Sequence, residues 1–166
     1  DLCGAFRPGH FRGVATVVNR LFNLVAPDVA ISGKKDYQQW LVIRLMTVDL
    51  GLPVEVIGVD TVREPDGLAM SSRNNYLSPE ERKLAPRLHE TLQRLRERVL
   101  REGMHLAAAE ENAVIDLQTD GFRPDYVNIR RQTDLQLPGP GDRQLVALAA
   151  AWLGRTRLID NVEFER

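Results

Sequence analysis

The sequence predicts an α/β protein in which a parallel sheet is followed by a small α+β unit with antiparallel strands. Two short apolar runs, 29–31 and 54–59, are separated by a segment with helical spacing of its apolar residues, 37–50. A strand, a helix and a second strand in this order predict a βαβ unit with parallel strands and a right-handed crossover. Two later apolar stretches around a turn, 145–153 and 156–159, predict an antiparallel hairpin instead.

Composition indicates an ordinary globular protein and argues against two classes of partner. The 166 residues are 43% hydrophobic and 27% charged, with a net charge of -1. Basic and acidic side chains are interleaved, so neither nucleic acid nor an anionic membrane is expected as a partner. No apolar run reaches membrane-spanning length, no signal peptide is apparent, and the one cysteine, Cys3, excludes an internal disulfide. We therefore expect a cytoplasmic protein.

The first unit is expected to contain two helices. The first covers 11–25, and the strand after it is expected to stop at Ser32 and Gly33. The second helix is expected to end at Gly51, the residue just past its C-cap. Its buried side is expected to carry the apolar residues Leu41, Leu45 and Val48.

The second unit is expected to begin with a well-marked helix start. Ser78 as N-cap, Pro79 at the first helical position and Glu81 two residues later have the pattern of a capping box. Helix should follow toward Arg101, with a break near Pro86. The remaining elements are predicted as a helix over 106–117, a strand over 125–130 and an exposed turn over 138–142.

The predicted parallel sheet is too small to be stable alone. Such sheets are normally covered on both faces and built from more than two strands, so further strands are expected before Asp1. We therefore interpret the chain as a fragment of a longer protein. The boundary between the two units is placed at 60–61, which gives a first domain of residues 1–61 and a second of 62–166.

Polar loops follow both predicted parallel strands, over 33–36 and 60–73. The carboxyl ends of parallel strands form the edge at which open α/β sheets bind ligands, so both loops are candidates for one site. The segment 66–77 combines a glycine turn, two adjacent hydroxyls and an arginine, a set that suits anionic oxygen. The alternative is a surface turn in which Ser71 and Ser72 cap the next helix.

Individual side chains in these loops allow a functional and a structural interpretation. Lys35 follows a strand and a glycine at a helix N-terminus and could reach a phosphate or carboxylate, whereas Lys34 is expected to be an ordinary solvated lysine. Asp36 and Gln39 have capping-box spacing, which is a sufficient structural role. His10 is more often a loop or core histidine than a base. The sequence contains no dinucleotide-binding glycine motif, no Walker A lysine and no zinc signature, so no protein metal site is predicted.

Four segments of the chain resemble the pantothenate synthetase family, the pantoate–β-alanine ligases. They are 7–14 (RPGHFRGV), 33–39 (GKKDYQQ), 66–77 (DGLAMSSRNNYL) and 151–161 (AWLGRTRLIDN). The resemblance covers essentially the whole chain and about the C-terminal three-fifths of such an enzyme. It implies the distal part of a Rossmann-like nucleotidyltransferase domain followed by a small α+β domain.

The resemblance also implies a reaction. In that family ATP and pantoate form pantoyl adenylate and pyrophosphate, and β-alanine then displaces AMP to give pantothenate. ATP is thus a substrate, Mg²⁺ is the expected metal, and the full-length enzyme is expected to be a homodimer. Attack of a carboxylate on the α-phosphorus needs positioning and charge neutralisation more than a covalent nucleophile.

The resemblance assigns roles to matching positions of this chain. Lys35 is expected at phosphate, Asp36 at ribose, and the backbone of Val62 at adenine, while Met70 begins the family's mobile phosphate-binding loop. Catalysis is assigned to Lys35, Ser71, Ser72 and Arg73. ATP binding is assigned to Gly33, Lys34, Lys35, Asp36, Val62, Met70, Ser71, Ser72 and Arg73. Pantoate binding is assigned to Arg7, His10 and Gln39.

The chain departs from the family in two respects. The family usually has glutamate where this chain has Lys34, so only the backbone of that position is expected to contact ATP. The family's N-terminal histidine-containing ATP motif and its first pantoate-binding glutamine are absent from the chain, so the isolated chain is expected to be inactive. Two alternatives remain: a related nucleotidyltransferase with another acceptor, and a non-catalytic nucleotide-binding or subunit-contact fragment.

Overall fold

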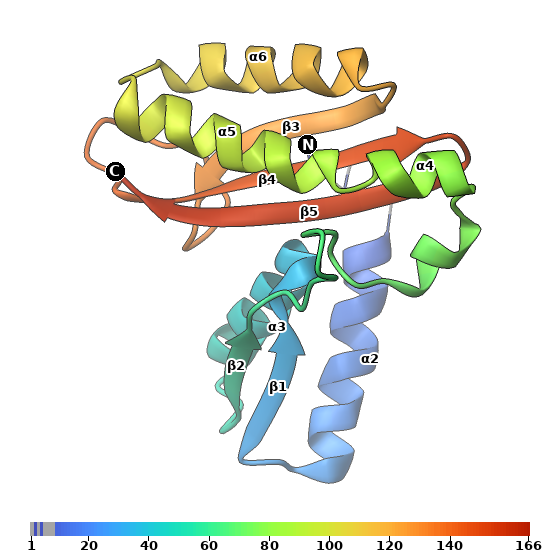
Figure 1. Ribbon diagram of the computed structural model, residues 1–166. Helices are drawn as coiled ribbons and strands as arrows, with labels where there is room; N and C mark the ends of the chain where they lie inside the picture. The colour runs from blue at the N-terminus through green and yellow to red at the C-terminus, as the bar shows by residue number, and fades with distance from the viewer. Residues whose placement is uncertain (1, 3, 5–8) are drawn as a thin grey trace. The chain divides into compact units, whose positions relative to one another are not determined.

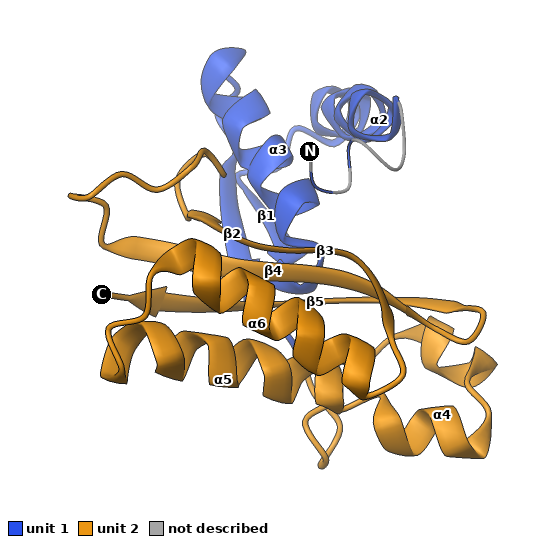
Figure 2. Ribbon diagram, turned by 90° about the horizontal axis from the view of Figure 1, so that it is seen from above, with its two compact units in different colours: residues 1–61 blue, residues 62–166 orange. Residues whose placement is uncertain are grey.

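The computed structural model describes residues 2, 4 and 9–166 of the chain (Figure 1). The chain separates into two compact units, residues 1–61 and residues 62–166 (Figure 2). Each unit has its own sheet: the first a parallel pair, the second an antiparallel sheet of three strands. The expected α/β fold class is confirmed.

Unit 1 is a βαβ unit preceded by a helix. Its two strands are parallel, as the sequence predicts, and they pair from Val29 opposite Glu55 to Gly33 opposite Val59. The helix α3 forms the crossover between them. The elements of this unit are α2 (His10–Val25), β1 (Val29–Gly33), the 3₁₀ turn η1 (Lys34–Asp36), α3 (Tyr37–Asp49) and β2 (Glu55–Val59).

Strand β1 is longer than expected. Ser32 and Gly33 do not stop the strand, because they pair with Gly58 and Val59 of β2. The backbone of Gly33 is extended, with φ of -73° and ψ of 131°. The ladder therefore continues to the first residue of the candidate ligand loop, and no flexible linker separates the two.

The buried face of α3 differs from the expected one. Leu41 is buried as predicted, but Leu45 and Val48 are exposed. The face that packs in the unit is formed by Tyr37, Trp40, Leu41, Ile43 and Thr47. Aromatic side chains near the start of the helix set this face, so Leu45 lies at its flank and Val48 in the last turn.

The end of α3 is the predicted one. Gly51 has a positive φ of 61°, which a residue with a Cβ rarely adopts. Its N–H donates to the Val48 carbonyl (3.1 Å), and the Leu52 N–H donates to the Thr47 carbonyl (2.9 Å). This is the Schellman pattern, in which the last free carbonyls of a helix find donors.

Unit 2 is a three-stranded antiparallel sheet with two long helices on one face (Figure 1). The strand order is β3-β4-β5. The predicted hairpin is confirmed, although its second strand continues to Glu165 instead of ending at Ile159. The elements are η2 (Ser72–Tyr76), α4 (Pro79–Leu84), α5 (Arg87–Arg101), α6 (Leu106–Thr119), β3 (Arg123–Arg131), β4 (Gln144–Leu153) and β5 (Thr156–Glu165).

The core of unit 2 lies between this sheet and the helices α5 and α6. Alternate residues of β4 point toward the helices, and most of them are alanines, whose small side chains let the helices approach the sheet closely. The leucines of α5 fill the space between. The buried residues that form this layer include Leu88, Leu92, Leu95, Ala113, Leu117, Leu145, Ala147, Ala149 and Ala151.

The start of α4 is the predicted capping box. The Ser78 hydroxyl accepts from the Glu81 N–H (3.2 Å), and the Glu81 carboxylate accepts from the Ser78 N–H (2.8 Å). Pro79 follows at the first helical position. The expected break at Pro86 is also confirmed, because α4 ends at Leu84 and α5 begins at Arg87.

Candidate functional site

The first candidate loop directly follows strand β1. Gly33 is the last strand residue, and η1 leads directly into α3. Because Gly33 pairs with Val59, the ends of both strands lie at one edge of the sheet. The Lys34 ammonium lies 3.5 Å from the Asp60 carboxylate, which follows β2. The predicted meeting of loops at the carboxyl edge therefore holds within unit 1.

Lys34 is not the solvated lysine that we expected. Its side chain is only 21% exposed and pairs with Asp60. Its ammonium also lies 5.6 Å from the centre of the Trp40 ring, and the Arg44 guanidinium lies 5.2 Å from the same ring. A cation over an indole face is attracted by the ring electrons. The contact was not predictable from the local sequence, because it depends on how α3 packs.

Trp40 in turn explains a glycine of β2. A Cβ at Gly58 would lie 2.7 Å from Trp40 Cε2, a distance that real side chains do not tolerate. The indole therefore packs directly on the backbone of β2. Gly58, Trp40 and Lys34 form a stack that ties the last part of the sheet to the start of α3.

Asp36 and Gln39 do not form the capping box that their spacing allows. Asp36 is the N-cap residue of α3, but its side chain makes no capping hydrogen bond. Its backbone, with φ of -89° and ψ of 61°, differs from the extended conformation usual for a capping residue. The expected structural role is therefore absent, and the Asp36 carboxylate is exposed at the edge of the sheet. Lys35 and Gln39 are half-buried beside it.

The second candidate loop starts from a small hairpin at the beginning of unit 2. The Met70 N–H donates to the Val62 carbonyl (2.9 Å), and the Glu64 N–H donates to the Leu68 carbonyl (2.8 Å). Gly67, with φ of 90°, makes the tight turn. Val62 and Met70 therefore lie side by side at the open end of this hairpin, and the loop leaves from there.

Ser71, Ser72 and Arg73 follow the hairpin. The Ser71 hydroxyl accepts from the Arg73 N–H (3.2 Å) and caps η2. Ser71 thus caps the next helical segment, as the structural alternative expects, whereas α4 is capped by Ser78. Ser72 and Arg73 are exposed, and within the described part of the chain no ion pair of the Arg73 guanidinium is found. The loop thus presents a hydroxyl and a cation to solvent.

A partly buried ionic cluster joins the hairpin to β5, and sequence reasoning missed it. The Arg63 guanidinium donates to both carboxylate oxygens of Asp160 on β5 (2.7 and 3.0 Å) and to the Gly67 carbonyl (3.1 Å). His89 Nδ1 lies 3.3 Å from the same carboxylate, and Gln93 Nε2 lies 3.1 Å from His89 Nε2. Asp160 is only 4% exposed. The available signal in the sequence was Asp160 itself, a charged residue in a stretch whose apolar and polar residues otherwise alternate as in a strand.

The charge of Asp160 is maintained by its neighbours. Burial raises the pKa of this carboxyl, but hydrogen bonds from His89 and Arg63, the charge of Arg63 and the Asn161 N–H act in the opposite direction and outweigh it. The pKa therefore lies below its ordinary value. Gln93 contacts the Nε2 edge of the His89 ring, while the Nδ1 edge faces the Asp160 carboxylate.

The two remaining candidates lie near the start of the chain. His10 is the first residue of α2, with its ring 5.1 Å from that of Phe11. Arg7 lies outside the described residues. The structure therefore brings together the loop residues within each unit. It does not show Arg7, His10 and Gln39, the residues expected to contact pantoate, arranged around one site.

The described residues, 2, 4 and 9–166, contain no group of three or more histidine, cysteine, aspartate or glutamate side chains that could hold a metal ion. In the same residues, no helix is both long and apolar enough to cross a membrane.

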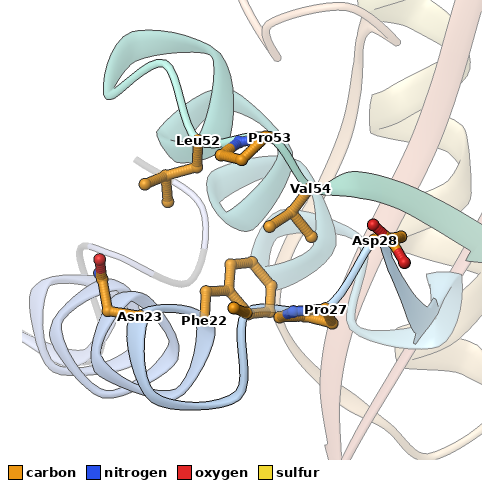
Figure 3. Close-up of a pocket in the computed structure, with 8 residues that line it drawn as sticks. Phe22, Asn23, Pro27, Asp28, Leu52, Pro53 and Val54 are labelled. Atoms are coloured by element: carbon orange, nitrogen blue, oxygen red, sulfur yellow. The ribbon is translucent and has the colours of Figure 1, made fainter.

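A pocket of about 290 Å³ lies in unit 1 at the other end of the strands (Figure 3). Asp28 and Val54, which line it, precede the starts of β1 and β2. None of the candidate site residues lines this pocket. It is formed by Phe22, Asn23, Ala26, Pro27, Asp28, Leu52, Pro53 and Val54.

Comparisons with known proteins agree on one family. The model of the family described as pantoate-beta-alanine ligase matches residues 1–163. The pantothenate synthetase of Thioalkalivibrio sulfidiphilus is 57% identical over 162 residues, which are 98% of this chain and 57% of that protein. The pantothenate synthetase of Chromobacterium violaceum is 55% identical over 166 residues, which are 100% of this chain and 60% of that protein.

Solved structures give the same result. The crystal structure of pantothenate synthetase from Thermus thermophilus matches with a TM-score of 0.90 and 50% identity, over 98% of this chain and 59% of that one. The pantoate-beta-alanine ligase of Francisella tularensis, complexed with beta-gamma ATP and beta-alanine, matches with a TM-score of 0.73 and 28% identity, over 98% and 53%. The chain thus spans well under two thirds of each relative.

The fold and the loops define an α/β protein with a Rossmann-like parallel unit and a polar loop at the carboxyl edge of its strands. The family match and the identity of the relatives then specify the protein more closely. The chain belongs to the pantoate–β-alanine ligase family, and the resemblance carried by its four motifs is confirmed.

Proposed function

We propose that the whole protein to which this chain corresponds joins pantoate to β-alanine at the expense of ATP. The pantoate carboxylate attacks the α-phosphorus of ATP, the bond to pyrophosphate breaks, and pantoyl adenylate forms. The β-alanine amine then attacks the acyl carbon, which gives pantothenate and releases AMP. The observation that carries the proposal is the match of residues 1–163 to the family. The beta-gamma ATP and beta-alanine in the complex of the Francisella relative support the choice of substrates.

In unit 1 the proposed ATP contacts are Gly33, Lys34, Lys35 and Asp36. Lys35 binds phosphate and neutralises charge that develops during adenylation, a role suited to its place beyond the last pair of the parallel ladder. Asp36 binds the ribose hydroxyls, which agrees with a carboxylate that does not cap α3. Lys34 contributes through its backbone, because its side chain is engaged by Asp60 and Trp40.

In unit 2 the proposed contacts are Val62, Met70, Ser71, Ser72 and Arg73. The backbone of Val62 contacts adenine, and the loop that starts at Met70 contacts the phosphates. Arg73 is suited to this by its exposed guanidinium, whose planar fork matches phosphate oxygens. Ser71 and Ser72 add hydroxyl donors. Lys35, Ser71, Ser72 and Arg73 are the proposed catalytic residues.

Pantoate is proposed to contact Gln39, His10 and Arg7. Gln39 lies in the first turn of α3, close in sequence to Lys35, and its amide can donate to a hydroxyl or carboxylate oxygen of the acid. His10 is the first residue of α2, and Arg7 lies outside the described residues. Their assignment is inferred from family motif positions alone.

Mg²⁺ fits this chemistry without a dedicated protein site. It usually binds through substrate phosphates, waters and one or two carboxylates. The described residues offer no cluster of three acidic or histidine ligands, but Asp36 is exposed next to the proposed phosphate contacts. Mg²⁺ would supply charge neutralisation on the phosphates.

The remaining proposals concern the whole protein. We propose a cytoplasmic homodimer that acts on small molecules, without a nucleic acid or membrane partner. Because the chain spans 57% to 60% of its relatives, the isolated chain is proposed to lack turnover.

The test is pantoate-dependent pyrophosphate release by the whole protein with ATP and Mg²⁺. Pantoate should support release, and β-alanine should then give AMP and pantothenate in equal amounts. Other hydroxy acids serve as matched controls. Release with another acid but not with pantoate would assign a different acceptor, and binding of ATP without any AMP formation would indicate a non-catalytic module.

A further inference from the structure

The ionic cluster of Arg63, Asp160 and His89 lies where the fold would be expected to place apolar side chains. Asp160 pairs with Ala149 across the β4–β5 ladder, and Ala149 belongs to the helix-covered core layer. Leu158 and Val162, two residues away on either side of Asp160, are part of the same layer. An apolar residue at this position would continue the core.

Stability alone does not account for such a pair. Replacing a buried ion pair with packed apolar residues is often neutral or stabilising, because the charges must first leave water. A feature that apolar residues cannot reproduce is directional bonding. Arg63 makes three bonds from one guanidinium, two to Asp160 and one to the Gly67 carbonyl. The cluster therefore fixes the orientation of the hairpin turn relative to β5.

The hairpin in turn holds both sides of the candidate phosphate loop. Met70 ends the hairpin through its bond to Val62, so the loop departs from a fixed point. On the far side of the loop, the Asn74 amide donates to the Ala69 carbonyl (3.1 Å), which returns η2 to the same hairpin. Ser71, Ser72 and Arg73 lie between these two anchors.

We propose that Arg63, Asp160 and His89 act as positioning residues for the phosphate loop of residues 70–73. Arg63 orients the stem of the loop, Asp160 holds Arg63 to β5, and His89 fixes the carboxylate from α5. This inference rests on the proposed function, because it assumes that the loop acts on nucleotide phosphates. In that setting a displacement of about 1 Å can cost about a hundredfold in rate, which is why a rigid stem matters.

The decisive variant removes both charges together. Arg63→Met/Asp160→Leu in the whole protein leaves no unpaired buried charge, so its unfolding midpoint should stay close to the parent value. Without the directed bonds, kcat/KM for ATP in pantoate-dependent pyrophosphate release should fall about tenfold or more. In the absence of ligands, the amides of residues 70–75 should exchange with solvent faster than in the parent, while those of β4 are unchanged.

Two further variants complete the design. Arg98→Met/Asp116→Leu removes an ion pair between α5 and α6 and is the control. The side chain of Arg98 is 24% exposed, close to the 23% of Arg63. This control variant should keep turnover and loop exchange at parent values. Arg63→Lys keeps the charge next to Asp160 but loses the planar fork, and should recover part of the lost kcat/KM. It also serves as the test if the double variant does not fold.

Parent-like turnover and loop exchange in a folded double variant would overturn the inference. Reduced turnover without faster loop exchange would overturn it as well, because the loss would then not act through the loop. The exchange measurement needs no substrate. A parent protein that releases no pyrophosphate would therefore contradict the proposed function while leaving the structural part of the test intact.

Discussion

Lys35 and Lys34 are adjacent, yet they have different environments. Lys34 is engaged with Asp60 and the Trp40 ring, whereas Lys35 lies half-buried at the start of the crossover helix, in the position proposed for phosphate. A charge that helps in the transition state and carries little packing should matter for rate much more than for folding.

Lys35→Ala in the whole protein is therefore expected to reduce pantoate-dependent pyrophosphate release by a factor on the order of 100 or more. Its unfolding midpoint should remain within the range of ordinary surface substitutions. Lys83→Ala, which removes an exposed lysine of α4, is the matched control and should leave the rate unchanged. Near-normal release by Lys35→Ala would remove Lys35 from the proposed catalytic set.

Asp160 gives a prediction about acid stability. Its pKa is lowered in the folded protein, so its contribution to stability is present above its ordinary value of 3.8 and is lost as the pH falls through the folded-state pKa. Asp160→Asn should lower the free energy of unfolding at neutral pH by about 1–3 kcal/mol, since the Arg63 guanidinium loses a charged hydrogen-bond acceptor.

The difference between the variant and the parent should shrink as the pH falls below about 3.8. Denaturant titrations from about pH 2.5 to about pH 7 would measure it across the range in which carboxylates titrate. Asp49→Asn, at an exposed position, is the control and should follow the parent at every pH. A difference that stays constant over this range would show that the charge of Asp160 is not what stabilises the unit.

At the scale of elements, contact between Trp40 of α3 and Gly58 of β2 sets how closely the crossover helix lies on the sheet. Gly58→Ala should destabilise the chain by about 1–3 kcal/mol, because the added methyl group would meet the indole at 2.7 Å. Gly13→Ala in α2, where an added Cβ meets nothing within 4 Å, is the control and should be neutral or stabilising. Thermal unfolding of both variants tests the contact, and equal midpoints would contradict it.

Local sequence signals predicted the elements well. The capping box at Ser78, the Schellman end at Gly51 and the break at Pro86 depend on bonds within a few residues, and all three are present. The prediction that Leu45 and Val48 are buried was wrong, because burial depends on which side of α3 meets its neighbours. A spacing rule cannot supply that information.

The candidate loops also show that local sequence does not predict contacts that depend on packing. Their residues were found from composition and from family motifs, but the environment of Lys34 depends on Trp40, and the support of the second loop depends on Asp160, which is far away in sequence. Asp36 had the spacing of a cap without forming one. The sequence therefore predicts which residues are of interest better than it predicts what holds them.

At the scale of the whole molecule, unit 1 has large apolar side chains exposed on every helix and strand. No residue of α2 is buried, although the helix is strongly amphipathic. Apolar surface of this extent favours association. The exposed residues include Val17, Leu21, Leu24, Val25, Ile31, Val48 and Val59.

The isolated chain 1–166 is therefore expected to self-associate and to form no AMP from ATP, pantoate and β-alanine. Light scattering at several protein concentrations would show the association. Leu21→Lys/Leu24→Lys on the exposed side of α2 should reduce it, whereas Arg155→Lys in the turn of unit 2 should not. A monodisperse monomer with robust turnover would contradict both expectations.

The stack of Lys34 on Trp40 also has an optical consequence. The chain has two tryptophans, and Trp152 lies in unit 2, so Trp152→Phe leaves Trp40 as the one indole emitter. We expect its fluorescence to respond to the two cations at its ring, Lys34 and Arg44. If a nucleotide binds beside Lys34 and Lys35, the emission of this variant should change in a saturable way on titration with ATP. Adding Lys34→Met should alter the emission before any ATP is present, which would tie the signal to the stack.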